Sequence, residues 1–216
     1  MSRRRRLLVL LLGLSLVRGF VYLALIPPWQ HYDEPTHFEY VRLIVEQDGL
    51  PGPDDYRLGM RREIAASMIA HNFWKGQPIP ALDVWSDRPP DIGFSELGHP
   101  PLYYLLLALP QFLLRHQEVE TQLYIARFFS VLLFPLLVLA AYGLTDELAG
   151  GRRWLPLAVA AFVALLPPLT DLASGVNNDV GAAVFASLLL WSSVRLLRRG
   201  PSWRRVTLTL LLAVAC

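Results

Sequence analysis

The sequence predicts an all-α membrane protein with several transmembrane helices. Of its 216 residues, 54% are hydrophobic and only 18% are charged. The apolar residues gather in long blocks of Leu, Val and Ala, and short arginine-containing joints separate the blocks, as in repeated membrane crossings. There is no basic face of the kind that a nucleic-acid-binding protein needs, so we expect no nucleic-acid partner. The lone Cys216 excludes an internal disulfide framework.

The first predicted element is a transmembrane helix over Leu7–Ile26. Its twenty residues would form about 30 Å of helix, which is enough to span a bilayer. The run of arginines at 3–6 predicts a cytoplasmic amino terminus. A cleaved signal peptide is the alternative, although the apolar stretch is long and the cleavage consensus near Ala24 is poor. Arg18 would cost about 3 kcal/mol if it faced lipid, so we expect it to face protein or to snorkel.

Further apolar runs predict helices, and the arginines between them predict their direction. The runs cover 102–114, 123–144, 154–169 and 180–197, and a last run, 206–216, reads as cut short, so we expect a truncated form of a longer protein. The run 102–114 has thirteen residues, fewer than the roughly seventeen that a crossing needs. If it does not cross, the basic joints at 152–153 and 195–205 are both cytoplasmic. We therefore predict an interfacial or re-entrant helix on the outer face.

This map divides the chain into three parts. Residues 1–26 form a basic cytoplasmic start and the first transmembrane helix, 27–121 an outer loop, and 122–216 the remaining transmembrane helices. Loops as long as the second part usually carry function. Within it we predict an amphipathic helix at 35–47 lying on the membrane and a second at 61–73. The proline-containing stretch 76–90 is expected to be irregular.

The candidates for chemistry are polar residues at the outer ends of the helices. Asp33 and Glu34 are adjacent carboxylates, which can hold a divalent cation or take a proton from an acceptor; a helix cap with ordinary surface charge explains them as well. His37 could share a helical face with them, or be a plain surface histidine. Asp179 opens helix 180–197, where a cap and a catalytic role both fit.

Two further residues also have more than one explanation. His99 stands before two prolines, and a structural turn is one explanation of it. Arg127, near the outer start of helix 123–144, could snorkel to the interface or pair with a phosphate. The phosphate-binding glycine patterns, the Cys/His zinc sets and the nucleophile elbow are absent from the sequence.

Taken together, these residues resemble the GT-C superfamily of membrane glycosyltransferases. The resemblance begins with Pro-Pro-x-x-x-x-Asp-Glu-Pro-x-His at 27–37, directly after a spanning helix. Gly-His-Pro-Pro-Leu-Tyr-Tyr at 98–104 and Arg-x-x-Ser at 127–130 are similar to segments of the protein-mannosyltransferase-like and aminoarabinose-transferase-like branches. The match covers nearly all of this chain but only the amino-terminal part of a usual member. The Asn-Asn-Asp at 177–179 differs from the Asp-Pro found in some branches.

The resemblance implies an enzyme of the plasma (inner) membrane that works on its outer face. It would move a sugar from a polyprenyl-phosphate-linked donor to a glycan, lipid or protein acceptor. A divalent cation, Mg²⁺ or Mn²⁺, held by Asp33 and Glu34 is the implied cofactor. The roles carried over are catalysis for Asp33 and Asp179, supporting or metal-side positions for Glu34, His37 and His99, and contact with the donor phosphate for Arg127.

Three alternatives stay open at this point. A fragment of such an enzyme, without its carboxy-terminal half, would be inactive alone. A membrane transporter or flippase would place ionisable residues inside its spans, where only Arg18 qualifies. A non-catalytic membrane assembly subunit would tolerate replacement of every acid.

Overall fold

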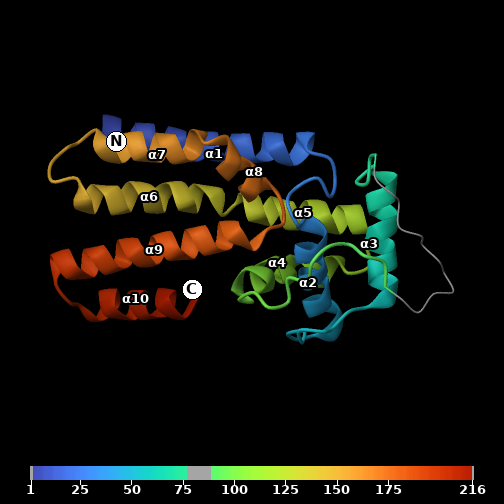
Figure 1. Cartoon of the computed structure of the whole chain (residues 1–216). Coiled ribbons are helices and arrows are strands. Elements are labelled where there is room, and N and C mark those ends of the chain that lie inside the picture. Colours follow the sequence, from blue (N-terminus) through green and yellow to red (C-terminus); the bar gives the residue numbers. More distant parts are fainter. Residues whose placement is uncertain (1, 77–88, 216) are drawn as a thin grey trace. The chain divides into compact units, whose positions relative to one another are not determined.

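The computed structural model describes residues 2–76 and 89–215, and in these residues it confirms the all-α class (Figure 1). Most of the stretch 76–90 that was predicted to be irregular lies outside the described residues. The helices are α1 (Arg3–Leu25), α2 (Glu34–Gln47), α3 (Leu58–Ala70), α4 (Leu102–Leu114), α5 (Val119–Val131), α6 (Phe134–Leu148), α7 (Leu155–Leu165), α8 (Pro167–Ser174), α9 (Asn178–Arg199) and α10 (Trp203–Ala215).

Within the described residues, three helical stretches are long and apolar enough to cross a membrane. They are α1, the 30-residue stretch Val119–Leu148 that contains α5 and α6, and α9. A fourth crossing results if α7 and α8, which meet at a 58° bend, form one broken span. The helix α4 has the predicted bounds and is too short for a crossing. The chain therefore has the helices of a multi-pass membrane protein.

Two of the predicted spans are interrupted by a break in the helix. The span expected at 154–169 is the pair α7 and α8, which are separated by Leu166 in an extended conformation. The following residue, Pro167, disfavours the helical conformation of the residue before it. The loop expected at 170–179 is wrong in its first half, because α8 runs to Ser174. The span expected at 123–144 begins earlier and ends later, with a short break between α5 and α6.

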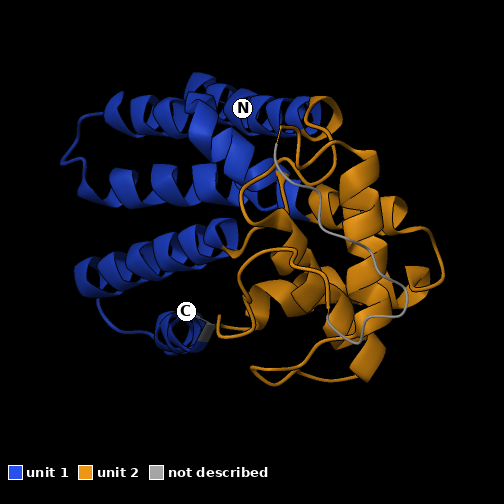
Figure 2. Cartoon of the chain, turned by 45° about the vertical axis from the view of Figure 1, so that its right-hand side comes forward, with its two compact units in different colours: residues 1–22, 130–174, 179–216 blue, residues 23–129, 175–178 orange. Residues whose placement is uncertain are grey.

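The chain separates into two compact units, coloured in Figure 2. Unit 1 contains residues 1–22, 130–174 and 179–216, and unit 2 contains residues 23–129 and 175–178. Unit 1 holds most of the candidate spans. Unit 2 holds most of the predicted outer loop.

Ion pairs in unit 1 join the start of α1 to the end of α6, and the end of α6 to the end of α9. Arg4 pairs with Asp146, and Glu147 accepts Arg199 at 2.8 Å. Since α6 and α9 both end at this side of the unit, the chain must return through α7 and α8 between them (Figure 1). The start of α1 and the ends of α6 and α9 therefore lie at one end of unit 1.

A glycine on α6 provides a test of how unit 1 packs. A Cβ atom at Gly143 would overlap the ring of Trp191 on α9, so we expect Gly143→Val to force the two helices apart. The expected loss is 1–3 kcal/mol, about the size of ordinary overpacking, measured as thermal unfolding of the chain in detergent. The matched control is Gly13→Val on α1, where a Cβ meets nothing within 4 Å. Equal stability of the two variants would contradict this packing.

Unit 2 is built around α2, which packs against α3 and α4. The prediction that 35–47 lies on the membrane surface is wrong, because every residue from Glu34 to Val45 is buried. Its polar side chains are paired: Glu39 accepts two hydrogen bonds from Arg61, at 2.5 and 3.0 Å. The second predicted helix, 61–73, is present as α3.

The helix α4 has one face in unit 2 and one outside it. It buries Tyr103, Tyr104 and Leu107, whereas Leu109 and Leu113 are 65% and 88% exposed. An exposed apolar face on a helix too short to span fits the predicted interfacial position.

Candidate functional site

The segment between α1 and α2 holds two residues in an unusual backbone conformation. Trp29 has φ 70° and Asp33 has φ 50°, in the left-handed region that bulky residues rarely enter. Such conformations persist only where surrounding contacts hold them, and they cluster at functional sites. Trp29 is fully buried, its indole N–H donates to Ser67 Oγ at 2.9 Å, and its ring packs edge-on against Phe38.

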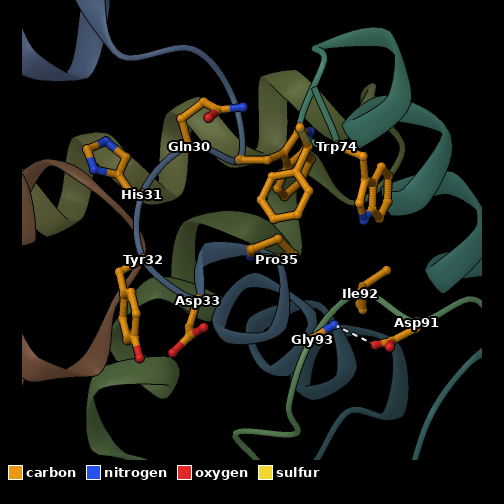
Figure 3. Close-up of a pocket in the computed structure, with 11 residues that line it drawn as sticks. Gln30, His31, Tyr32, Asp33, Pro35, Trp74, Asp91, Ile92 and Gly93 are labelled. Atoms are coloured by element: carbon orange, nitrogen blue, oxygen red, sulfur yellow. Dashed lines mark hydrogen bonds between the residues drawn. The ribbon is translucent and has the colours of Figure 1, made fainter. Parts of the chain in front are cut away.

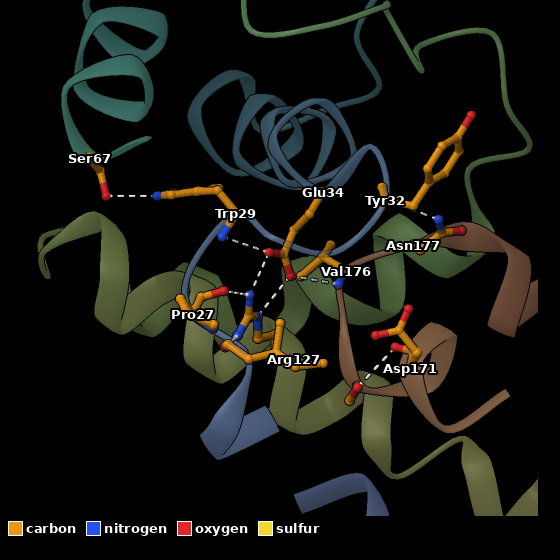
Figure 4. A network of polar contacts seen from close by, with 11 residues as sticks. Pro27, Trp29, Tyr32, Glu34, Ser67, Arg127, Asp171, Val176 and Asn177 are labelled. Carbon is orange, nitrogen blue, oxygen red and sulfur yellow. Dashed lines mark hydrogen bonds and ion pairs between the residues drawn. The ribbon is translucent and has the colours of Figure 1, made fainter. Parts of the chain in front are cut away.

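A buried ion pair holds this segment in place (Figure 4). Arg127 donates from Nε to Glu34 Oε1 at 2.8 Å and from Nη2 to Oε2 at 2.6 Å. Both side chains have no exposed surface. A two-point arginine–carboxylate pair of this kind fixes orientation as well as charge.

The pair also satisfies backbone groups on both sides of it. Arg127 donates to the carbonyl oxygens of Ile26 and Pro27 at 2.8 and 2.9 Å. Glu34 accepts the backbone N–H of Trp29 at 3.0 Å and that of Val176 at 3.1 Å. The two residues therefore hold the segment that carries Asp33, together with segment 175–178.

These contacts differ from the roles predicted for the pair. The carboxylate of Glu34 is enclosed, and all hydrogen bonds of the Arg127 guanidinium go to protein groups. In this arrangement the two side chains bind each other and backbone groups, and their predicted contacts with a lipid phosphate and a metal stay predictions. The sequence singled out both residues, which lie 93 positions apart, but not their contact with each other.

The carboxylate of Asp33 faces a different environment. Asp33 occupies the N-cap position of α2, but its side chain makes no capping hydrogen bond to the helix. Asp33 is half-buried and lines a cavity of about 590 Å³ (Figure 3). Among the described residues it has no side-chain hydrogen bond or ion pair, so its carboxylate can serve a ligand in the cavity.

The other walls of the cavity come from positions that sequence reasoning did not select. Phe73 and Trp74 follow α3, and Asp91 lies on the segment before α4. Asp91 accepts the backbone N–H of Gly93 at 3.0 Å. The cavity is completed by Trp29, Gln30, His31, Tyr32, Pro35, Ile92 and Gly93. Phe73, Trp74 and residues 91–93 are brought to Asp33 by folding, whereas residues 29–32 and 35 are its neighbours in the sequence.

The predicted metal centre does not fit this geometry. Among residues 2–76 and 89–215, no group of three or more His, Cys, Asp or Glu side chains is placed to hold a metal ion. Glu34, the expected second ligand, is used by Arg127.

The segments 27–37 and 98–104, which carry two of the sequence motifs, contact each other in unit 2 through ring-containing side chains. His37 Nδ1 lies 2.8 Å from the hydroxyl of Tyr104, and the ring of Tyr104 stacks on Tyr40 at 3.9 Å between centroids. The rings of His37 and His99 are 6.1 Å apart, and His99 pairs with Glu96 at 2.6 Å. Neither histidine lines the cavity of Asp33, so their predicted supporting role is not direct contact there.

Burial, followed by the electrostatic effect of His99, lowers the pKa of His37 to about 4. His37 is therefore neutral at pH 7. As pH falls below about 6.5, the unfolded chain takes up this proton before the folded one does. The folded state is therefore most stable, with respect to this histidine, above pH 6.5, and it loses this part of its unfolding free energy as pH falls towards 4.

We expect this titration to remove up to about 3 kcal/mol of unfolding free energy between pH 6.5 and 4. In His37→Gln this part of the pH dependence should disappear, as measured by denaturant unfolding in detergent at a series of pH values. His116→Gln is the control, because His116 is exposed and should keep the wild-type slope. A wild-type slope in His37→Gln would contradict the assignment.

Asp179 belongs to unit 1, where it is exposed in the first turn of α9. The preceding Asn177 belongs to unit 2 and is buried. Its backbone N–H donates to the hydroxyl of Tyr103 at 2.9 Å, and its side-chain amide donates to the carbonyl of Tyr32 at 3.3 Å. The Asn-Asn-Asp segment at 177–179 therefore contacts the segment between α1 and α2, which carries Asp33, through Asn177. The catalytic role of Asp179 stays a prediction.

Comparison of the chain with protein-family models, with curated proteins and with solved structures finds no match.

Proposed function

We propose that this chain is a membrane glycosyltransferase with a polyprenyl-phosphate-linked sugar as donor. The observation that carries the proposal is the placement of Asp33 at a cavity, with no protein partner among the described residues. The carboxylate of its neighbour Glu34 is buried in an ion pair with Arg127. Of the two adjacent carboxylates, only Asp33 is then available as a general base.

The proposed step is a single displacement at the anomeric carbon. The acceptor hydroxyl or amide gives its proton to the Asp33 carboxylate while its oxygen or nitrogen forms the new bond to the sugar. The bond between the anomeric carbon and the phosphate oxygen breaks, and the polyprenyl phosphate leaves with the bonding pair. A positioned general base of this kind contributes typically 10²–10⁴-fold to the rate.

The lining of the cavity supports a sugar as the ligand. Trp74 and Phe73 offer flat apolar surfaces, and Asp33 and Asp91 offer hydrogen-bond acceptors. A sugar ring carries hydroxyl donors around its edge and apolar C–H groups on its faces. Pockets that combine apolar walls with a few convergent polar groups are the usual form of small-molecule sites.

The membrane geometry supports a lipid-linked donor. The exposed apolar face of α4 belongs to the same unit as the cavity, which suits a site at headgroup depth. The arginine-rich ends of unit 1 favour a cytoplasmic amino terminus. On this assignment the Asp33 cavity works on the outer face of the plasma membrane.

The proposal is tested by sugar transfer in membranes that contain the protein at its natural length. We expect release of free polyprenyl phosphate from a polyprenyl-phosphate sugar, and no use of the corresponding nucleotide sugar. Membranes without the protein are the control. Absence of release from any polyprenyl-phosphate sugar, with a folded protein in the membrane, would overturn the proposal.

One observation favours a transporter as the second candidate. Arg18 lies inside α1 and donates to Thr170 Oγ1 at 3.2 Å, next to the break between α7 and α8. Ionisable residues beside broken helices are frequent in transporters. Substrate movement across vesicles that is lost in Arg18→Gln, without sugar transfer, would favour this function.

A further inference from the structure

A second cavity, of about 450 Å³, lies in unit 1 between α9 and α10. The two helices form a hairpin that turns at Gly200, whose φ of +76° suits a glycine. Ser192 on α9 and Thr209 on α10 are joined by a hydrogen bond of 2.6 Å. The walls of this cavity are therefore held together by a contact within the hairpin.

The cavity is polar at one end and apolar at the other. Along α9 its lining runs from Arg195 through Trp191 to Leu188, and along α10 it runs from Arg204 to Leu212. Seven or eight residues of helix correspond to about 10–12 Å. Guanidinium groups thus line one end of the cavity, and leucine side chains line the other end, about 10 Å further along the helices.

The arginines at and near the polar end of the cavity outnumber the acidic side chains that pair with them. Residues 195–205 contain five arginines and no acid. Among the described residues their ion pairs go to Glu147 alone, which accepts Arg195 at 3.7 Å and Arg199 at 2.8 Å. Arg205 donates to the carbonyls that end α9. Arg204 is exposed and has no hydrogen bond or ion pair to any described residue.

The geometry points to a binding site for an anionic phospholipid. Its phosphate lies between Arg195, Arg204 and Arg205, and one acyl chain lies along Leu188, Leu208 and Leu212. Charge complementarity selects this ligand, because a cavity with arginines at headgroup depth and leucines beneath them repeats the polarity of a phospholipid. Basic pockets between transmembrane helices are known to bind anionic headgroups. The site is separate from the Asp33 cavity and does not depend on the proposed glycosyltransferase activity.

The test uses the whole chain in phosphatidylcholine bilayers that contain a small fraction of spin-labelled lipid. Electron paramagnetic resonance then measures the motionally restricted fraction for phosphatidylglycerol and for phosphatidylcholine. We expect preference for phosphatidylglycerol in the wild type. Each arginine should contribute about fivefold, so Arg195→Gln/Arg204→Gln should remove most of the preference.

The control is Arg152→Gln/Arg153→Gln, which removes the same charge from the loop between α6 and α7. It should keep the wild-type preference, because these arginines do not line the cavity. In a third variant, Leu208→Trp fills the apolar part without changing charge and should lower the restricted fraction. No preference in the wild type would overturn the proposal. Equal losses in both double variants would also do so, since they indicate general surface charge.

Discussion

Asp33→Asn should lower the rate of sugar transfer by at least about a hundredfold, the usual contribution of a positioned general base. The substitution removes the proton acceptor and keeps the size of the side chain. Asparagine also tolerates the left-handed backbone that Asp33 adopts at φ 50°. The variant should therefore fold and remain in the membrane. The measurement is release of polyprenyl phosphate at saturating donor, in membranes with equal amounts of each protein.

The chain offers a closely matched control at the other end of α2. Asp48 also has φ 50°, and it lines a different cavity in unit 2. Asp48→Asn makes the same chemical change in the same backbone conformation, so its rate should stay within about twofold of the wild type. Near-wild-type transfer by Asp33→Asn would show that Asp33 is not the base. Equal losses in the two variants would indicate a structural effect.

Arg127→Gln should cost about 3–5 kcal/mol of stability, because it leaves the Glu34 carboxylate buried without its cation. Both side chains have no exposed surface, so water cannot replace the lost partner. Two backbone carbonyls also lose their donor. The measurement is denaturant unfolding in detergent, followed by the fluorescence of the tryptophans.

A double-mutant cycle separates the charge from the hydrogen bonds. Glu34→Gln/Arg127→Gln removes both charges, and we expect it to be more stable than Arg127→Gln alone. The control is Arg199→Gln, whose side chain is 50% exposed in its pair with Glu147, and which should cost no more than about 1 kcal/mol. A loss below 1 kcal/mol in Arg127→Gln would contradict the structural role of the pair.

The sequence alone was sufficient for the class of protein and for most of its helices. Apolar runs and prolines have local effects, so α4 has the predicted bounds and α1 and α9 differ from prediction by a few residues. The ion pairs of Asp146 and Glu147 show that the start of α1 and the ends of α6 and α9 lie together, and the side of the membrane on which they lie stays a prediction from the arginines. The burial of α2 was not predictable in this way, because its polar residues have partners on distant segments, such as Arg61 and Glu63 on α3.

The candidate site was predictable in its residues but not in their roles. Asp33 and Glu34 are adjacent in the motif, so their spacing gives no reason to assign them different roles. Only the tertiary structure separates them, since successive side chains at a helix start point in different directions. Glu34 meets Arg127 from 93 positions away, and Asp33 meets a cavity whose aromatic wall follows α3. The sequence therefore determined a multi-pass helical protein with acids at a helix end. Tertiary packing decided which acid is structural and which is open to a ligand, because that choice depends on contacts between distant segments.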